Sequence, residues 1–346
     1  MIHRIRIEGD AQEVPAAEGE TILDALLRHG VGFSYSCQAG NCGSCKCGHV
    51  SGPIAELEWS EHALTPAERA RGIVLACRAR ARGDLVIRRL GNETFVMHPA
   101  RTLHCRLVEK TPLTHDVLRL RFAIESGGPF TFSPGQFAKL AFPFAPDAPR
   151  DYSMANVPAE PLLEFHVRTL EGGISALVRE RLQVGDAVRI GGPYGTSYLR
   201  EQHRGPILAI AGGTGLAPIR SIVRSALAHG LPGPIHVYFG VREERDVYGE
   251  AELRGLAALH PALRLHVVVA EPDGAAPGRR SGLVTELVAQ DFADCAGFHA
   301  YLAGPPAMVE SAVDLLHARG LASRDIHADA FYGAGVAQPA KPSSEA

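Results

Sequence analysis

Residues 37–45 read CQAGNCGSC, a stretch in which three cysteines are separated first by four residues and then by two. A fourth cysteine, Cys77, follows after 31 more residues. This spacing is typical of a plant-type 2Fe-2S cluster, whose two irons require four thiolates. Backbone N–H groups must approach the cluster sulfurs closely, and the small residues of the stretch permit that approach. We therefore predict that Cys37, Cys42, Cys45 and Cys77 bind a 2Fe-2S cluster.

The other cysteines have simpler interpretations. Structural zinc sites usually pair cysteines in two C-x2-C knuckles, whereas the first gap here is four residues long and contains a glycine. The spacing therefore favours a 2Fe-2S cluster, and zinc is kept as the alternative metal. Cys47 follows Cys45 in what should be the next strand and is predicted to lie on its other face as a small buried residue. Cys105 and Cys295 are predicted to be buried in the same way.

Composition limits the classes of protein to consider. The chain has 346 residues, of which 46% are hydrophobic and 21% are charged, as in a globular protein of two or three domains. A formal net charge of −3 supplies no basic surface for nucleic acid. No apolar run approaches the roughly 18 residues that span a bilayer, and the N-terminus lacks the apolar core of a secretory signal. We expect a cytoplasmic protein that binds neither nucleic acid nor a membrane and has no disulfide framework.

The chain on either side of the cysteines shows three successive patterns, which predict a multidomain protein. Residues 1–94 combine short strands with one amphipathic helix, as in a small α+β domain. Residues 95–202 carry short β-rich runs separated by Pro and Gly, which indicate an antiparallel β-barrel. Residues 203–335 alternate apolar strands with helices, the pattern of an α/β doubly wound sheet. Residues 336–346 are rich in Pro, Ala and Ser and are predicted to be disordered.

Two glycine-rich turns precede predicted helices, whose N-termini offer free N–H groups to phosphate. Gly172 and Gly173 lead into a helix expected from Ala176. The strand 207–211 runs into GGTGLAP at 212–218 and then into a second helix. The second turn departs from the G-x-G-x-x-G fingerprint because Pro218 replaces the last glycine, and it lacks the lysine of a P-loop.

Several motifs resemble those of the ferredoxin-reductase superfamily, and their order over nearly the whole chain resembles the reductase components of naphthalene dioxygenase-type ring-hydroxylating oxygenases. The motifs are RDYSMA at 150–155, EGGIS at 171–175, GPYG at 192–195, GGTGLAP at 212–218, FGVR at 239–242, AGPPAM at 303–308 and DAFY at 329–332. The resemblance implies a plant-type ferredoxin domain of β-grasp fold, a barrel that binds FAD and a doubly wound domain that binds NAD(P)H.

The resemblance also implies roles in the barrel. Arg150 would pair with the FAD pyrophosphate, Tyr152 would pack on the isoalloxazine, and Ser153 would hydrogen-bond near flavin N5, where hydride arrives. Phe331 or Tyr332 would cover the flavin. The further residues expected at the cofactors are His166, Arg168, Gly173 and Ser175.

For the nucleotide, the resemblance implies contacts from two turns and one loop. Thr214 would position the nicotinamide, and the other expected contacts are Gly213, Gly215, Arg242, Gly304 and Pro305. The family has a cysteine where this chain has Ala303, so we assign Ala303 no catalytic role. Residues 241–245 carry both signs of charge. An acidic group there would accept the ribose 2′-hydroxyl of NADH, whereas Arg242 or Arg245 would hold the 2′-phosphate of NADPH, and a solvated loop is the third interpretation. We favour NADH and keep NADPH as possible.

We therefore predict an oxidoreductase that passes electrons from NAD(P)H to FAD, then to the 2Fe-2S cluster, and then to a separate ferredoxin or directly to a terminal oxygenase. Reductases of multicomponent monooxygenases and of deoxysugar dehydratases share this domain order and remain alternatives. A cluster-binding scaffold joined to a nucleotide sensor is the non-enzymatic alternative. The intact residues expected at the hydride path, Arg150, Tyr152, Ser153 and Thr214, argue against it.

Overall fold

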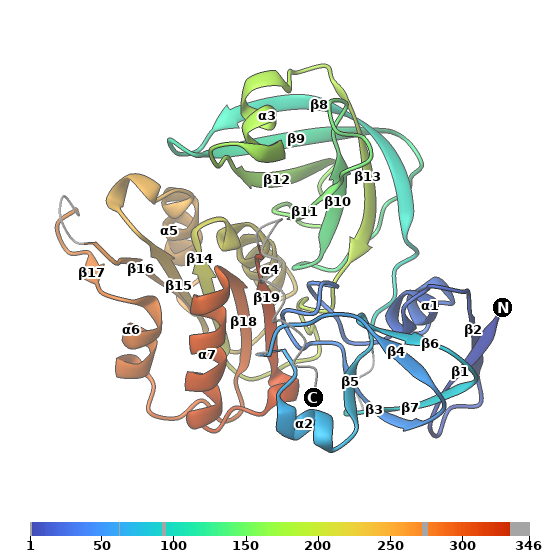
Figure 1. The fold of residues 1–346 in the computed structure, drawn as a ribbon. Helices are drawn as coiled ribbons and strands as arrows, with labels where there is room; N and C mark the ends of the chain where they lie inside the picture. Colours follow the sequence, from blue (N-terminus) through green and yellow to red (C-terminus); the bar gives the residue numbers. More distant parts are fainter. Residues whose placement is uncertain (1, 62, 92–94, 272–275, 333–346) are drawn as a thin grey trace. The chain divides into compact units, whose positions relative to one another are not determined.

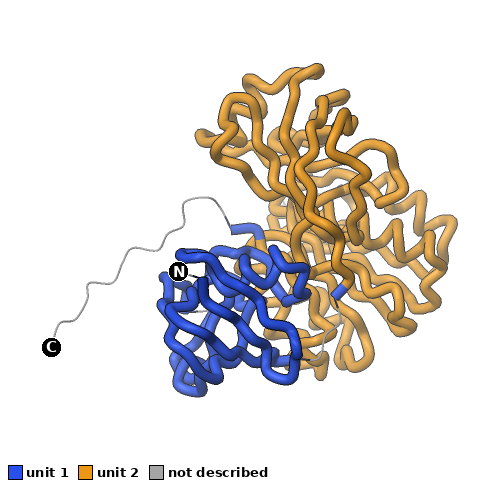
Figure 2. The backbone as a smooth tube through the Cα atoms, turned by 90° about the vertical axis from the view of Figure 1, so that its right-hand side faces the viewer, with its two compact units in different colours: residues 1–95, 331–346 blue, residues 96–330 orange. Residues whose placement is uncertain are grey.

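The computed structural model describes residues 2–61, 63–91, 95–271 and 276–332. It divides into two compact units: one holds the described part of 1–95 together with Phe331 and Tyr332, and the other spans 96–330 (Figure 2). The segment 336–346, predicted to be disordered, lies outside the described residues.

The first unit is a mixed sheet with a helix packed on it, as expected for the ferredoxin domain. The sheet order is β2-β1-β7-β3-β5, and β1 pairs with β7 in parallel. Helix α1 begins after Thr21, whose side chain accepts a hydrogen bond from Asp24 N, and Gly30 follows its end with a left-handed φ of +71°. The elements are β1 His3–Ile7, β2 Glu13–Ala16, α1 Ile22–Arg28, β3 Lys46–Ser51, β4 Ile54–Glu56, α2 Pro66–Ala70, β5 Ile73–Leu75, β6 Ala79–Ala81 and β7 Leu85–Arg89.

The second unit begins with the predicted antiparallel barrel (Figure 1). Its sheet order is β11-β10-β13-β8-β9-β12, and a bridge between Met154 and Phe165 brings the two outer strands together. Alternate residues of β8, among them Leu103, Cys105 and Leu107, are buried in the barrel core. The elements are β8 Arg101–Pro112, β9 Val117–Ser126, β10 Phe137–Ala141, β11 Arg150–Ser153, β12 Leu162–Arg168, α3 Gly173–Arg181 and β13 Ala187–Tyr194.

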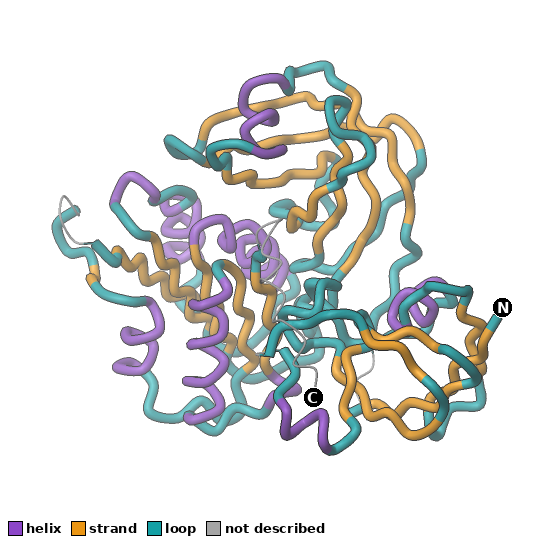
Figure 3. Tube along the Cα trace, viewed as in Figure 1, coloured by secondary structure: helices purple, strands orange, loops and turns teal. Residues whose placement is uncertain are grey.

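The rest of the second unit is a parallel sheet in the order β17-β16-β15-β14-β18-β19. Helices α4 and α5 cover one face and α6 and α7 the other (Figures 1 and 3). From β14 the chain first adds β15, β16 and β17 on one side and then returns to add β18 and β19 on the other. The order of the strands thus reverses between β14 and β18, and doubly wound sheets bind their ligands at such a point. The elements are β14 Ile207–Gly212, η1 Gly213–Gly215, α4 Leu216–Ala228, β15 Ile235–Val241, η2 Glu244–Asp246, α5 Glu250–Leu259, β16 Leu263–Val269, β17 Arg280–Ser281, α6 Val284–Asp291, β18 His299–Gly304, α7 Pro306–Ala318, η3 Ser323–Asp325 and β19 Ile326–Ala330.

The motif at 150–153 is strand β11, paired residue by residue with β10. One local feature differs from the sequence-based expectation. Helix α3 begins at Gly173, three residues earlier than predicted, because Gly172, with a φ of +77°, turns the chain directly into the helix. No helix in the described ranges is both long enough and apolar enough to cross a membrane.

Candidate functional site

The cysteine loop of the first unit brings the predicted cluster ligands into a suitable arrangement. Cys45 Sγ lies 3.2 Å from Cys77 Sγ, and both residues are buried. The backbone N–H groups of Ala39 and Asn41 each donate to Cys37 Sγ at 3.4 Å. A hydrogen bond with Cys42, assisted by these amides against the effect of burial, lowers the pKa of Cys37 to about 6. The amides therefore stabilise negatively charged sulfur at Cys37, whereas the hydrogen bond with Cys37 and burial raise the pKa of Cys42, and the hydrogen bond with Cys77 and burial raise that of Cys45.

Glycine is required at two positions of this loop. Gly40 has a φ of +78°, and a Cβ there would lie 2.8 Å from Arg78 Cγ and 3.1 Å from Trp59 Cβ. Gly43 has a φ of +71°, and its Cβ would lie 2.9 Å from the Ala63 carbonyl oxygen. Neither position accommodates a side chain, so the loop can turn its amides toward the sulfurs only with glycine there. The donor set and its amides fit a 2Fe-2S cluster.

The three remaining cysteines are buried, as their sequence context predicted. Cys47 lies within β3 and is fully buried, and burial raises its pKa to about 12. Burial likewise raises the pKa of Cys105 to about 12 and raises that of Cys295. Buried thiols of this kind behave as small apolar side chains.

The C-terminal tyrosine lies in the first unit and contacts the cysteine loop. The Tyr332 hydroxyl donates to the carbonyl oxygen of Asn41 at 2.8 Å, and the N–H of Asn41 donates in turn to Cys37 Sγ. The sequence prediction that Phe331 or Tyr332 covers the flavin stays a prediction. The observed Tyr332 contact supports the loop between two predicted cluster ligands.

In the barrel, strand β11 positions the three residues predicted at the flavin. Arg150 donates to the carbonyl oxygens of Ala148 and Pro149 at 3.1 and 3.0 Å, and no carboxylate in the described ranges forms an ion pair with it. Such a guanidinium remains available to a pyrophosphate. Tyr152 packs edge-on against Phe142, and burial raises the pKa of the Tyr152 hydroxyl to about 12.

Ser153, at the end of β11, meets a carboxylate that the sequence analysis did not identify as functional. Ser153 Oγ lies 3.3 Å from Asp329 Oδ2, and both residues are buried. Asp329 belongs to the DAFY motif at the end of β19, so the barrel and the nucleotide sheet both contribute to this pair. A buried hydroxyl–carboxylate pair can hold a reacting group and accept or donate a proton.

The turn before α3 is open, as a phosphate cradle requires. Gly172 and Gly173 have φ values of +77° and +69°, and a Cβ at either position would meet no atom within 4 Å. Ser175 Oγ accepts a hydrogen bond from Leu170 N at 3.1 Å and so stabilises the turn. Arg168 pairs with Asp116, with 2.7 Å between Arg168 Nε and Asp116 Oδ2, and its predicted place at a cofactor stays a prediction.

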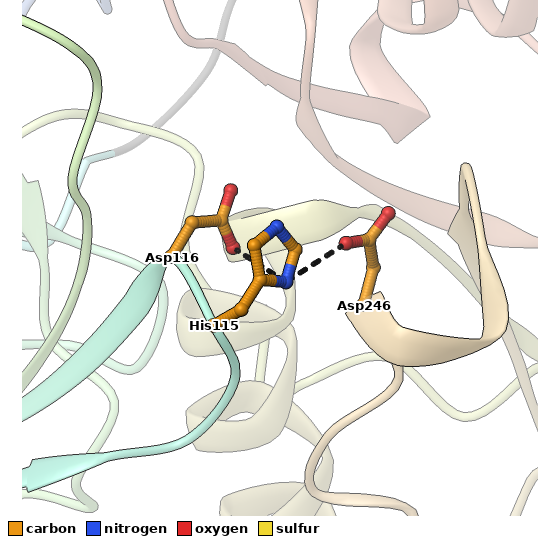
Figure 4. A group of neighbouring side chains, drawn as sticks. All are labelled: His115, Asp116 and Asp246. Atoms are coloured by element: carbon orange, nitrogen blue, oxygen red, sulfur yellow. Dashed lines mark ion pairs between the residues drawn. The ribbon is translucent and has the colours of Figure 1, made fainter.

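A small charged group lies where the β8–β9 turn approaches η2 (Figure 4). His115 Nδ1 lies 4.0 Å from Asp116 Oδ1 and 3.7 Å from Asp246 Oδ1. Because Asp116 already pairs with Arg168 and His115 is exposed, these residues form a surface ion-pair group between the barrel and the nucleotide sheet.

The predicted nucleotide turns abut each other at the point where the strand order of the sheet reverses. A Cβ on Gly215 would lie only 1.9 Å from the carbonyl oxygen of Ala303, and a Cβ on Gly304 would lie 2.8 Å from that of Gly212. In contrast, a Cβ on Gly213 would meet no atom within 4 Å. Two turns are thus packed backbone to backbone with an open glycine beside them, an arrangement that allows a dinucleotide to approach the main chain.

The loop after β15 carries the charges predicted to choose the nucleotide. Glu243 pairs with both neighbouring arginines, at 2.8 Å from Arg245 Nε and 3.4 Å from Arg242 Nη2. Arg242 Nε also lies 3.9 Å from Glu271 Oε1. Arg242 and Arg245, which would hold a 2′-phosphate, therefore already form ion pairs with carboxylates.

His166 is held by protein groups on both ring nitrogens, and its predicted place at a cofactor stays a prediction. Its Nε2 lies 3.2 Å from Glu164 Oε1 and its Nδ1 lies 3.2 Å from the Tyr248 hydroxyl. Tyr248 was not identified from the sequence, because its partner is 82 positions away in the chain. The burial of Glu164 and His166, two polar residues on the face of β12 that points away from the barrel core, indicates that this face packs against another part of the protein.

Three protein-family descriptions match successive parts of the chain. Residues 5–82 match a 2Fe-2S iron-sulfur cluster binding domain, residues 104–198 an oxidoreductase FAD-binding domain, and residues 209–314 an oxidoreductase NAD-binding domain. The order of these matches is the order of modules predicted from the sequence.

Whole-length relatives agree with this order. The chain is 46% identical over 93% of its length to the ferredoxin–NAD(P)+ reductase component of naphthalene 1,2-dioxygenase and salicylate 5-hydroxylase systems of Ralstonia sp., covering 96% of that protein. It is 40% identical over 95% of its length to the corresponding component of the Pseudomonas putida naphthalene 1,2-dioxygenase system, covering 99% of it. The crystal structure of an Amycolatopsis cytochrome P450 reductase is similar with a TM-score of 0.80 and 34% identity, over 95% of this chain and 98% of that one.

Proposed function

Because this chain belongs to the reductase components of naphthalene dioxygenase-type ring-hydroxylating oxygenase systems, we propose that it takes hydride from NADH and delivers single electrons to a separate ferredoxin of such a system. The observation that best supports electron transfer is the geometry of the cysteine loop. Two backbone amides donate to Cys37 Sγ, and the Sγ atoms of Cys45 and Cys77 lie 3.2 Å apart. When bound, FAD accepts the hydride and releases electrons singly, and the 2Fe-2S cluster accepts one electron at a time.

The residues of β11 would hold FAD at its pyrophosphate and at its ring. Arg150 would bind the pyrophosphate with its available guanidinium, Tyr152 would pack against the ring, and Ser153 would place its hydroxyl near N5. Asp329, to which that hydroxyl donates at 3.3 Å, would orient it and could accept a proton through it. The open turn at Gly172 and Gly173 receives a phosphate.

The nucleotide lies along the turn at Gly213–Gly215, with Thr214 and the Gly304–Pro305 turn placing the nicotinamide toward the flavin. The two turns lie at the point where the strand order reverses, between β14 and β18, which supports this placement. The close contact of Gly215 with Ala303 leaves no room for either turn to move independently.

NADH is the preferred donor because of the charges after β15. Glu243 offers a carboxylate to the ribose 2′-hydroxyl, and Glu243 and Glu271 together balance the charge of Arg242 and Arg245, which would otherwise attract a 2′-phosphate. A phosphate brought to this loop would meet Glu243 and Glu271 with unfavourable charge. We expect kcat/KM for NADH to exceed that for NADPH.

A separate ferredoxin is the preferred acceptor because the two naphthalene dioxygenase relatives, which the chain covers to 96% and 99%, carry that acceptor in their names. A terminal oxygenase that takes electrons directly is the other outcome. Mixing the reduced protein with each purified component from the same source and following reoxidation separates the two, since only the true acceptor restores the oxidised spectrum rapidly.

The proposed electron path is tested with two cysteine variants. Cys77→Ser removes a ligand and should abolish reduction of cytochrome c by NADH while sparing reduction of ferricyanide, which accepts electrons from the flavin. Cys47→Ser, which alters a fully buried cysteine outside the ligand set, should retain both activities and the cluster spectrum. Unchanged cytochrome c reduction in Cys77→Ser would overturn the ligand assignment, and loss of both activities would show that the flavin module depends on the cluster for its structure.

A further inference from the structure

Three buried side chains join the barrel to the nucleotide sheet and have no part in the function proposed above. Glu164 and His166 lie on β12, on the face opposite to the core residues Leu163, Phe165 and Val167. His166 Nε2 lies 3.2 Å from Glu164 Oε1, and His166 Nδ1 lies 3.2 Å from the hydroxyl of Tyr248, just before α5. The same hydroxyl lies 3.5 Å from the carbonyl oxygen of Gly213.

The charges around these residues determine where the protons are. Burial alone would raise the pKa of Glu164, but the hydrogen bond from His166 and the charge of Arg220 outweigh it and lower that pKa to about 2. Burial lowers the pKa of His166, partly offset by Glu164, so the ring is neutral at pH 7. Its one proton is on Nε2, donated to the carboxylate, so Nδ1 can only accept. The single hydroxyl proton of Tyr248 is therefore shared between two acceptors, His166 Nδ1 and the carbonyl oxygen of Gly213.

Helix α4, which begins at the glycine turn, is held to the barrel on the same side. Arg220 Nη1 donates to Glu164 Oε1 at 3.2 Å and to the carbonyl oxygen of Ala155 at 2.7 Å. Ser221 Oγ donates to the carbonyl oxygen of Asn156 at 2.7 Å. Ala155 is the last residue of the RDYSMA motif, and Asn156 directly follows it. The start of α4 and Tyr248 thus hold the glycine turn from two sides.

We propose that Tyr248, oriented by His166 and Glu164, is a positioning residue for hydride transfer. It fixes the turn at Gly213 relative to barrel strand β12, and so sets how the nicotinamide meets the flavin. This inference rests on the proposed function, which places the nucleotide at that turn. Because Tyr248 contacts protein groups at the turn, it affects alignment more than nucleotide affinity.

The test removes only the hydroxyl. Tyr248→Phe keeps the aromatic ring, which packs edge-on against His166 and Phe239 at centroid distances of 5.3 and 5.7 Å. The matched control is Tyr238→Phe, which removes the hydroxyl that donates to Asp291 at 2.5 Å within the nucleotide sheet and its helices, away from β12. Flavin reduction is followed in the holoenzyme by anaerobic stopped-flow absorbance over a range of NADH and of NADH deuterated at the transferred position.

We expect the rate constant at saturating NADH to fall about fivefold to tenfold in Tyr248→Phe, with an increased deuterium isotope effect and an apparent Kd within twofold of the wild-type value. Hydrogen–deuterium exchange should increase at 207–216 and at β12, a readout independent of activity. Tyr238→Phe should change none of these. A Tyr248→Phe rate within twofold of wild type would overturn the inference, even with a lowered melting temperature, and would leave the hydroxyl a structural role. Wild-type flavin that NADH does not reduce would instead contradict the proposed function.

Discussion

Gly215→Ala is the substitution whose effect the structure defines most sharply. A Cβ at this position would lie 1.9 Å from the Ala303 carbonyl oxygen and 2.4 Å from the Ala303 carbonyl carbon, which are backbone atoms of β18. Ordinary contact with a Cβ begins at 3.4 Å, so the two nucleotide turns must separate by about 1.5 Å. No rotation of a side chain can relieve this overlap, because the clashing atoms belong to the main chain.

A displacement of this size affects the reaction more than it affects the fold. Misplacement by about 1 Å can lower a rate about 100-fold when reacting atoms must meet in one geometry. Overpacking of this kind costs about 1–3 kcal/mol in the free energy of unfolding, which a chain of this size can tolerate. We therefore expect Gly215→Ala to fold with a lower melting temperature and to reduce its flavin about 100-fold more slowly than the wild type.

The assay is anaerobic stopped-flow reduction of the flavin by NADH, with the melting temperature measured in parallel. Gly230→Ala is the matched control, because Gly230 has a φ of +62° and open space around it at the other end of α4. That variant should be destabilised by about 1–2 kcal/mol through its left-handed backbone and yet retain the wild-type rate. A Gly215→Ala rate within threefold of the wild-type rate would refute the reasoning that the two turns must be in contact for hydride transfer.

Three further predictions concern single hydrogen-bonded side chains. Asp329→Ala removes the carboxylate beside Ser153 and should lower NADH-dependent ferricyanide reduction about tenfold; a value within twofold would show that the pair has no role in the reaction. Tyr332→Phe removes the hydrogen bond to Asn41 and should accelerate bleaching of the cluster by a chelator about fivefold, whereas an unchanged bleaching rate would count against support of the loop by this tyrosine. Because the pKa of Glu164 is lowered to about 2, its carboxylate stabilises the folded state above about pH 4.5 and loses that effect as the pH falls toward 2. Glu164→Gln should therefore flatten the dependence of melting temperature on pH in that range, and parallel curves for the two proteins would contradict the ion pairing.

Local sequence patterns were sufficient to predict those elements whose structure depends only on residues close together in the chain. The glycine turn that leads into α3 and the strand that runs into the second glycine turn each depend on neighbouring residues, and the structure contains both. The short β-rich runs that form β8 and β12 likewise predicted the barrel. These features follow from periodicity and turn chemistry, which act over a few residues.

Contacts between distant segments could not be predicted in the same way. The Ser153–Asp329 pair joins residues 176 positions apart, and the contact of Tyr332 with Asn41 joins residues 291 positions apart. Strand β11 exists because β10 pairs with it, although its own sequence, RDYS, has little strand character. Which partner a buried polar residue finds is decided by tertiary packing, and a single sequence contains no direct record of it.

Coupling of the two redox centres is the central claim, and the visible spectrum of the purified protein before and after anaerobic addition of NADH tests it most directly. Flavin bands superimposed on broad 2Fe-2S absorption, with both bleached by NADH, are the result that the proposed function predicts. A colourless protein that contains one zinc ion, or bound flavin that NADH does not reduce, would contradict it.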